Sequence, residues 1–346
     1  MLTRRGMLRG ATGTGLMLAG GARLAAAQGS PQGSQQASQR ERNKAVVLGY
    51  KEAMKTKPQK EVEAAFMGPR YRRIRSGMQN IAANARDQGF PAAGDYLRGA
   101  FPDRTDTVEE IIADGDMVGL LFKLTGTHKG HFFGIAPTGK KIDVHEVGIF
   151  RIADGKIVES WFMADEVRLL RQIGATLPAR NDGKRIVPPV TGEGQDADAV
   201  IRRLEANTLS TVEDRNRLLV VRSKGSAPPK DVRAADFRQR RPGFLNLREY
   251  GVRHGAPKET VTSAMPERRD PIDGLLAEGE KVWMRFKLAA VHSKPLYGLP
   301  PTGRRIEAPE IGIARIVDGK WKDAWYFGDE LGLLLQLGYA DRVLAP

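Results

Sequence analysis

The chain has 346 residues, of which 41% are hydrophobic and 28% are charged, a composition typical of a globular protein with room for two or three domains. It contains no cysteine, which excludes disulfides, thiolate metal sites and a cysteine nucleophile. The formal net charge is +14, but the basic residues are spread along the chain and form no recognised nucleic-acid motif. We therefore expect no nucleic-acid partner.

The first 27 residues predict a twin-arginine export signal. Arg4 and Arg5 precede an apolar run rich in Gly and Ala, and residues 25–27 are all alanine. The run is too short and too rich in glycine to remain as a spanning helix, so we expect no stable membrane insertion. Cleavage after Ala27 and a periplasmic or secreted mature protein are the expected outcome.

The rest of the chain contains one domain twice. Residues 114–174 align without gaps with residues 278–338, at an offset of 164 positions. The matched pairs that bear on chemistry are His128 and His292, Glu146 and Glu310, Trp161 and Trp325, and Asp165 and Asp329. A period this long indicates duplicated domains, because solenoid repeats are several-fold shorter. We expect the two copies to form an intramolecular pseudo-dimer.

These features divide the chain into five expected segments. They are a signal peptide (1–27), a flexible tether rich in Gln, Ser and Gly (28–39), a first domain (40–177), a linker containing several Pro and Gly (178–197) and a second domain (198–346).

Within each copy, helical periodicity comes first and strand-like alternation follows. The expected helices are 41–55 and 198–219, and the expected strands of the first copy are 109–113, 117–127, 141–152 and 156–163. Asp-Gly pairs at 114–115 and 154–155 predict tight hairpin turns. The sequence therefore predicts an α+β fold in each copy. Its N-terminal helices cover a curved antiparallel sheet and enclose a cone-shaped pocket.

Glu146 is the one charged residue on an otherwise apolar strand face, because residues 142–152 alternate with a period of two. Glu310 repeats the pattern in the second copy. A carboxylate in this position is costly to bury unless it is paired or lines a wet pocket. Two interpretations stay open: an acid, base or ligand anchor in a cavity, or an internal salt bridge to a nearby arginine.

Asp165 and Asp329 each follow a tryptophan by four residues and precede an apolar run. A carboxylate at a strand end beside a pocket is suited to general acid or base chemistry. The other interpretation is that each aspartate caps the helix that follows, and the two roles are compatible.

His128 and His292 come at the end of a strand, before a loop that leads to a Pro-Thr-Gly turn. Histidine titrates near neutrality and therefore suits proton transfer, although a lone histidine is more often structural. The five histidines include no pair at ligand spacing, and no nucleotide-binding or serine-hydrolase motif is present. We expect neither a metal nor a cofactor.

Several segments together resemble the SnoaL-like polyketide cyclase or ester cyclase family of the NTF2-like superfamily. They are Ala100-Phe101-Pro102-Asp103, Asp114-Gly115-Asp116, Thr127-His128-Lys129-Gly130, Gly134-Ile135-Ala136-Pro137-Thr138-Gly139-Lys140, Asp154-Gly155-Lys156-Ile157 and Leu169-Leu170-Arg171-Gln172-Ile173-Gly174.

The resemblance implies tandem cone-shaped α+β barrels that close a ring by intramolecular aldol condensation with acid-base residues alone. Asp165 is the position to which it carries the catalytic role. We expect the pocket to take a small carbonyl compound, with Glu146, His128, Glu310, His292 and Asp329 as further catalytic candidates. Aromatic walls are expected from Tyr71, Phe150, Trp161 and Trp325. A non-catalytic binder of an apolar small molecule is the alternative.

Overall fold

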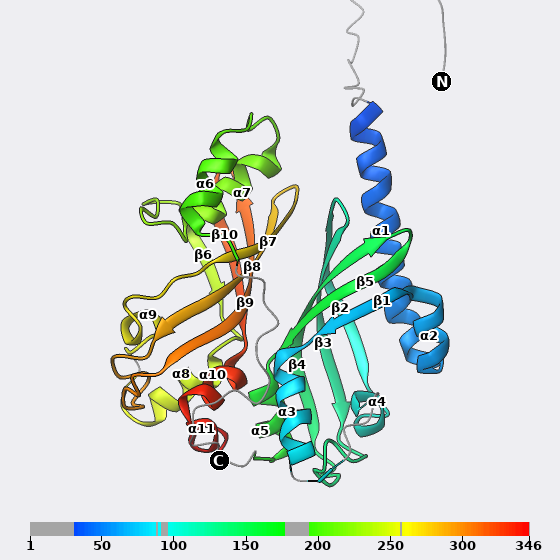
Figure 1. The fold of residues 1–346 in the computed structure, drawn as a ribbon, viewed down its shortest axis with the longest axis vertical. Helices are drawn as coiled ribbons and strands as arrows, with labels where there is room; N and C mark the ends of the chain where they lie inside the picture. Colours follow the sequence, from blue (N-terminus) through cyan, green and yellow to red (C-terminus); the bar gives the residue numbers. More distant parts are fainter. Residues whose placement is uncertain (1–30, 88, 91–95, 177–193, 257, 346) are drawn as a thin grey trace, which may run out of the picture.

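The computed structural model describes residues 31–87, 89–90, 96–176, 194–256 and 258–345 (Figure 1). The predicted signal peptide and residues 178–193 of the predicted linker lie outside the described residues. None of the described helices is long and apolar enough to cross a membrane.

The two copies have the same order of strands, preceded by different helices. The first copy contains α1 (Pro31–Thr56), α2 (Gln59–Phe66), β1 (Met67–Ile74), α3 (Ser76–Asp87), α4 (Tyr96–Ala100), β2 (Thr105–Asp114), β3 (Met117–Thr127), β4 (Lys141–Ala153), β5 (Lys156–Ala164) and α5 (Glu166–Ile173). The second contains α6 (Ala197–Glu205), α7 (Val212–Arg222), β6 (Arg233–Arg240), α8 (Leu245–Arg253), α9 (Val261–Ala264), β7 (Ile272–Glu278), β8 (Lys281–Val291), β9 (Arg305–Val317), β10 (Lys320–Gly328), α10 (Glu330–Leu337) and α11 (Ala340–Leu344).

Each copy forms a five-stranded sheet, with the order β1-β5-β4-β3-β2 in the first and β6-β10-β9-β8-β7 in the second. The α+β prediction is confirmed, and the four strands predicted in the first copy are β2 to β5. The prediction of an antiparallel sheet was incomplete, because the edge strands β1 and β6 pair in parallel with β5 and β10. These edge strands are rich in arginine and largely exposed, so they lack the apolar alternation that marks a strand.

Two helix predictions also differ from the structure. Residues 31–39, predicted as part of a tether, form the first turns of α1, because Gln, Ala and Arg favour a helix that continues directly from the apolar part. The single helix predicted at 198–219 is broken into α6 and α7. Thr211 starts α7 with a capping box, in which its side chain accepts from the Asp214 backbone N–H and Asp214 accepts in return.

One face of each sheet is covered by its own helices. In the first copy, Val47 and Tyr50 of α1 and Val62 of α2 pack on Phe122 of β3 and Phe150 of β4. This helix-covered face carries the interior of the cone.

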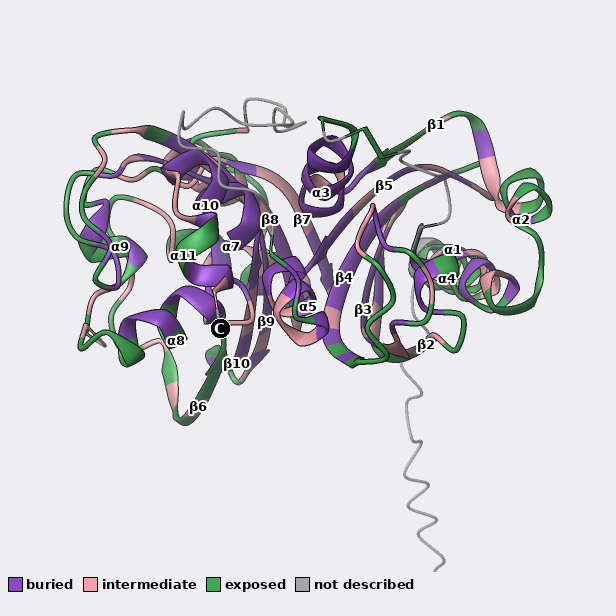
Figure 2. Ribbon diagram, turned by 90° about the horizontal axis from the view of Figure 1, so that it is seen from below, coloured by how far each residue is buried: buried purple, intermediate pink, exposed green. Residues whose placement is uncertain are grey.

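The opposite faces of the two sheets pack against each other, and Figure 2 shows buried strands where they meet. The shared apolar cluster takes residues from both copies: Ile112, Leu121, Val147, Ile149 and Met163 from the first, and Leu276, Trp283, Ile311, Ile313 and Phe327 from the second. Because both faces of each sheet are covered, charged side chains on these strands need partners inside the protein.

At the centre of this contact, Trp283 lies against Gly119. These two residues occupy equivalent positions in the repeat, and a Cβ atom built on Gly119 would lie 2.7 Å from the Trp283 ring. The indole N–H of Trp283 donates to Glu110 at 3.0 Å. The large residue of one copy therefore fills the space left by the small residue of the other.

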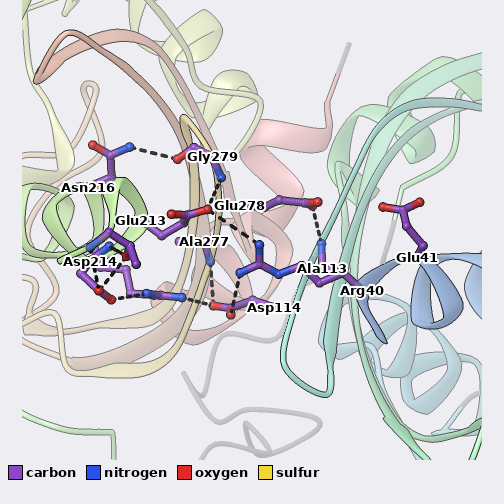
Figure 3. Close-up of polar contacts among 12 residues, drawn as sticks. Arg40, Glu41, Ala113, Asp114, Glu213, Asp214, Asn216, Ala277, Glu278 and Gly279 are labelled. Atoms are coloured by element: carbon purple, nitrogen blue, oxygen red, sulfur yellow. Dashed lines mark hydrogen bonds and ion pairs between the residues drawn. The ribbon is translucent and has the colours of Figure 1, made fainter. Parts of the chain in front are cut away.

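The hairpins of the two copies exchange equivalent polar contacts (Figure 3). Asp114 accepts a hydrogen bond from the Ala277 backbone N–H at 2.9 Å, and Glu278 accepts one from the Ala113 backbone N–H at 2.8 Å. Lys44 of α1 pairs with Glu278. Such reciprocity is the pattern of contacts around a two-fold axis.

We predict that Gly119→Ala destabilises the protein by about 1–3 kcal/mol, because its methyl group would overpack the contact with Trp283. Urea unfolding measures this change as a lower midpoint. Gly99→Ala in α4 is the matched control, because no atom lies within 4 Å of a Cβ built there. An unchanged midpoint for Gly119→Ala would show that the two sheets do not pack as described.

Candidate functional site: the charged interiors of the two cones

Glu146 points into the first cone and is almost fully buried, with 1% of its surface exposed. Its Oε1 lies 2.7 Å from Nη2 of Arg75, whose side chain is equally buried. The predicted position of Glu146 on the inner face is confirmed by its cross-strand partner Phe122 and by its burial. Of the two interpretations, the internal salt bridge to an arginine is present, and it lies beside a cavity.

A second charged group lies in the same cone. Asp106 of β2 binds Lys51 of α1 and accepts two hydrogen bonds from Arg104 at 2.8 and 2.7 Å. The Lys51 ammonium also lies 3.6 Å from the centre of the Phe122 ring. Burial lowers the pKa of Lys51 to about 8. Burial acts to raise the pKa of Asp106, but the hydrogen bond from Arg104 and the charge of Lys51 outweigh it and hold that pKa below its ordinary value.

The second cone repeats both groups. Glu310 lies 3.1 Å from Arg241, and Asp270 lies 2.7 Å from both Lys224 and Arg268. The Lys224 ammonium lies 3.8 Å from the centre of the Phe286 ring. Burial lowers the pKa of Lys224, as it does for Lys51. Each cone therefore contains two carboxylates, two arginines and one lysine next to an aromatic ring.

The two cones differ in the space that they leave. In the first, the cavity beside Glu146 has a volume of about 20 Å³, which is room for one water molecule, and Phe162 and Tyr50 are among the residues around it. In the second, a pocket of about 410 Å³ opens next to Tyr326, the counterpart of Phe162. The first cone thus leaves little room beside Glu146, and the pocket of the second copy is lined by Tyr326 but not by Glu310 or Arg241.

His128 and His292 stabilise the loops that follow them. Nδ1 of each ring lies 3.1 Å from the hydroxyl of a threonine, Thr138 or Thr302, and the Thr302 backbone N–H also donates to Nδ1 of His292. Both rings are fully buried, and burial lowers the pKa of both. These contacts favour neutral histidines that hold the Pro-Thr-Gly turn, and neither ring is among the residues lining the cavities described above.

Asp165 and Asp329 cap the helices that follow them. Asp165 accepts from the Arg168 backbone N–H at 2.9 Å, and Asp329 accepts from the Gly332 backbone N–H at 2.8 Å. Asp165 also accepts from the side chain of Asn246 in the other copy at 2.9 Å. The capping interpretation is confirmed, and the structure places Asp165 in the contact between the copies, away from the residues that line either cone's cavity.

Asn246 links Asp165 to Glu330, another buried carboxylate. Its amide donates to Glu330 Oε2 at 2.6 Å, and the Leu247 backbone N–H donates to the other oxygen at 2.6 Å. Burial raises the pKa of Asp165, and burial together with the neighbouring Asp165 raises the pKa of Glu330. Burial also raises the pKa of Glu166, the counterpart of Glu330. The junction between the copies therefore concentrates carboxyl groups that favour the protonated form.

Of the four predicted aromatic wall residues, two face the interior of the first cone and two do not. Phe150 packs at 5.2 Å from Phe162, and the Tyr71 hydroxyl lies 2.5 Å from Ser160 Oγ. Trp161 and Trp325 lie on the face between the copies, so their predicted place in a pocket wall was wrong. The period of two explains this placement, because each tryptophan is one residue away from the inward-facing Phe162 or Tyr326.

The lysines Lys51 and Lys224, and the roles of Arg104 and Asp106, were not predicted from the sequence. Arg104 and Asp106 recur in the repeat as Arg268 and Asp270, so their conservation between the copies was a usable signal. The lysines recur at a different offset, 224 − 51 = 173, because the first copy has more residues between its lysine and its edge strand: 67 − 51 = 16 positions to the start of β1, against 233 − 224 = 9 positions to the start of β6. Among the described residues, no group of three or more His, Asp or Glu side chains has an arrangement suited to a metal ion.

Two helix-covered mixed sheets with buried carboxylate–arginine pairs in their interiors make this chain a tandem α+β protein. A family model for SnoaL-like polyketide cyclase matches residues 79–173 and 234–337, which is more than half of the chain. The chain belongs to the SnoaL-like polyketide cyclase family.

Curated relatives agree with this assignment. The aklanonic acid methyl ester cyclase DnrD of Streptomyces peucetius is 47% identical over 58 residues, which cover 16% of this chain and 40% of the relative. The nogalonic acid methyl ester cyclase of Streptomyces nogalater is 31% identical over 106 residues, which cover 28% of this chain and 78% of the relative. The chain thus spans about two-fifths of the length of DnrD.

Solved structures with similarity to the chain include a SnoaL-like polyketide cyclase from Jannaschia sp. CCS1, at 27% identity and a TM-score of 0.33, covering 39% of this chain and 92% of that one. TsrD from Streptomyces laurentii is 22% identical with a TM-score of 0.30, covering 38% of this chain and 96% of that one.

We predict that Arg75→Met destabilises the protein by about 3–5 kcal/mol, because it leaves buried Glu146 without its ion-pair partner. Chemical unfolding of the purified variant measures the change. Arg72→Met is the control, because the Arg72 side chain is 67% exposed and its ion pair with Glu159 is worth at most about 1 kcal/mol. Equal losses for the two variants would contradict a buried pair.

We also predict a pH dependence at the junction between the copies. Because burial raises the folded-state pKa of Glu330 above that of the unfolded chain, this carboxyl stabilises the fold when it is protonated, and its contribution is lost as the pH rises from about 4 towards that raised pKa. Glu330→Gln should therefore flatten the dependence of the urea midpoint on pH between about 5 and 8. Glu267→Gln, at an exposed position between α9 and β7, should leave the dependence as in the parent, and an identical slope for all three proteins would contradict this assignment.

Proposed function

We propose that the protein is a cofactor-free cyclase or isomerase that acts on a small carbonyl compound, with the cone carboxylates Glu146 and Glu310 as acid-base groups. The observation that carries the proposal is the duplicated interior, in which a buried carboxylate lies beside an arginine, a lysine and an aromatic ring. Membership of the SnoaL-like polyketide cyclase family supports the same class of reaction.

The proposed reaction is an intramolecular aldol closure. The carboxylate takes a proton from the carbon next to one carbonyl, the resulting enolate forms a C–C bond to a second carbonyl carbon of the same molecule, and the new alkoxide takes a proton back. Arg241 and Lys224 of the second cone would stabilise the negative oxygen of the enolate. No electrons leave the substrate, so the reaction needs no redox partner.

A non-catalytic binder is the second candidate. It is favoured by the pairing of Glu146 and Glu310 with arginines, since a buried ion pair of this kind can serve to hold the interior of the cone together without taking part in a reaction. It is also favoured by the use of Asp165 as a helix cap.

We further propose that the mature protein is exported and that its two copies form an intramolecular pseudo-dimer. Support for export is confined to the twin arginines and the alanines at 25–27. The reciprocal hairpin contacts of Asp114 and Glu278 support the pseudo-dimer.

Turnover of nogalonic acid methyl ester, followed by liquid chromatography, tests the enzyme proposal. The double variant Glu146→Gln/Glu310→Gln should lose at least about 100-fold in kcat, because it removes the general base from both cones, while the affinity for the ester stays within about threefold.

The matched control is Asp143→Asn/Glu307→Gln, which changes the equivalent outward-facing carboxylates on the same two strands. Full turnover by the cone double variant would contradict the proposed base. Binding of the ester by the parent protein without turnover would favour the binder.

A further inference from the structure

We propose that a pocket at the junction between the copies binds a small organic anion that carries two negative charges on an apolar body. This basic pocket, lined by Lys140, Arg168 and Arg171 among others, has a volume of about 390 Å³, within the range of small-molecule sites. It shares no lining residue with the cavities described for the two cones, so it is separate from the site of the proposed reaction.

Both copies contribute to the basic pocket. The first copy supplies residues of α5, the residues that follow it up to Thr176, and Lys140, which directly precedes β4. The second copy supplies Asn246 and Glu249 of α8 and Leu344 of α11, and Figure 1 shows α5 and α11 close together near the C-terminus. The pocket therefore exists only where the two copies pack against each other.

The lining of the basic pocket carries an excess of positive charge. Lys140, Arg168 and Arg171 contribute three cations, and Glu249 contributes one carboxylate. Arg171 lies 2.9 Å from Glu249, and this ion pair accounts for one charge of each sign. Two positive charges are left, and they match the two negative charges of a dianion.

The two remaining cations have no ion-pair or hydrogen-bond partner in the part of the chain that the structure describes. At Lys140 and Arg168 the backbone N–H donates a hydrogen bond, whereas the charged end of the side chain donates none. A Cβ atom built on Gly174 would collide with Nζ of Lys140, which places this ammonium at the end of α5. Arg168 is half-buried in the lining, and a guanidinium offers the planar set of donors that binds a phosphate or carboxylate group through two oxygens.

Another part of the lining is apolar. Ala175 and Leu344 line the basic pocket and are both buried. Inorganic phosphate or sulfate would leave this surface without an apolar contact, whereas the carbon skeleton of an organic anion would cover it. The pocket therefore favours an organic dianion over an inorganic one.

The second copy lacks this set of cations. At the offset of 164 positions, the residues that correspond to Lys140, Arg168 and Arg171 are Arg304, Gly332 and Leu335. The Arg304 side chain donates to the backbone oxygen of Gln336 at the end of α10. We therefore expect one site per chain.

The probe is 1-naphthyl phosphate, a phosphate monoester that carries about two negative charges above neutral pH next to an apolar ring. We expect saturable binding to the full chain with one probe per protein molecule, measured by isothermal titration calorimetry. 1-Naphthoate has the same ring and one negative charge, so it should bind at least about tenfold more weakly. Uncharged 1-naphthol should not bind.

Arg168→Gln and Lys140→Gln should each weaken the binding of 1-naphthyl phosphate about tenfold, because each removes one of the two cations that have no protein partner among the described residues. Arg304→Gln is the matched control, because it removes the corresponding charge of the second copy, and it should change the dissociation constant by less than about twofold. Far-ultraviolet circular dichroism and the urea midpoint verify that each variant is folded.

Three results would overturn the assignment: two probes per molecule, equal affinities for the phosphate and the carboxylate, or equal effects of Arg168→Gln and Arg304→Gln. If Lys140 and Arg168 serve only to stabilise the end of α5, their variants should lower the urea midpoint and leave the affinity for the probe unchanged. The titration measures binding alone. A protein that turns over no ester would leave this site intact, and a probe that fails to bind would defeat the site and leave the enzyme proposal intact.

Discussion

The structure depends on the burial of both faces of each sheet. One face packs on its own helices and the other on the second copy, so any charged side chain that points from a central strand must find its partner within the protein. Glu146 and Arg75 satisfy this requirement in the first copy, and Glu310 and Arg241 satisfy it in the second. The same constraint accounts for the Lys–Asp–Arg groups that accompany these pairs, because an isolated lysine at this depth would lose its charge.

Duplication within one chain relaxes the symmetry that two identical subunits would impose. Gly119 and Trp283 occupy equivalent positions and contact each other, which a pair of identical copies could not reproduce, because they would place glycine on glycine or tryptophan on tryptophan. The hairpin contacts of Asp114 and Glu278, by contrast, are equivalent in the two copies. The same freedom allows Trp321 in one cone where Ile157 stands in the other. Divergence of the copies therefore explains how the pockets near Phe162 and Tyr326 differ in volume.

Much of the fold could be predicted because the signals are local or repeated. The alternation in residues 141–152 predicted β4 and the inward direction of Glu146, and the Asp-Gly pairs predicted the hairpins. The edge strands β1 and β6 could not be predicted in this way, since their exposed arginines carry no alternation, and parallel pairing with β5 and β10 depends on tertiary contacts. The site was harder for a similar reason. The sequence around Asp165 fits a helix cap and a general base equally well. Only the contact with Asn246 of the other copy shows where Asp165 lies. The predicted positions of Trp161 and Trp325 were wrong, because side chains one position apart along a strand point to opposite faces of the sheet.

Paired charges are buried inside both cones, with Glu146 on Arg75 in the first and Glu310 on Arg241 in the second. A crystal structure of the full chain tests this arrangement most directly. We expect both carboxylates to point into their cones and to lie within ion-pair distance of these arginines. Cone carboxylates that turn outward into solvent would contradict it.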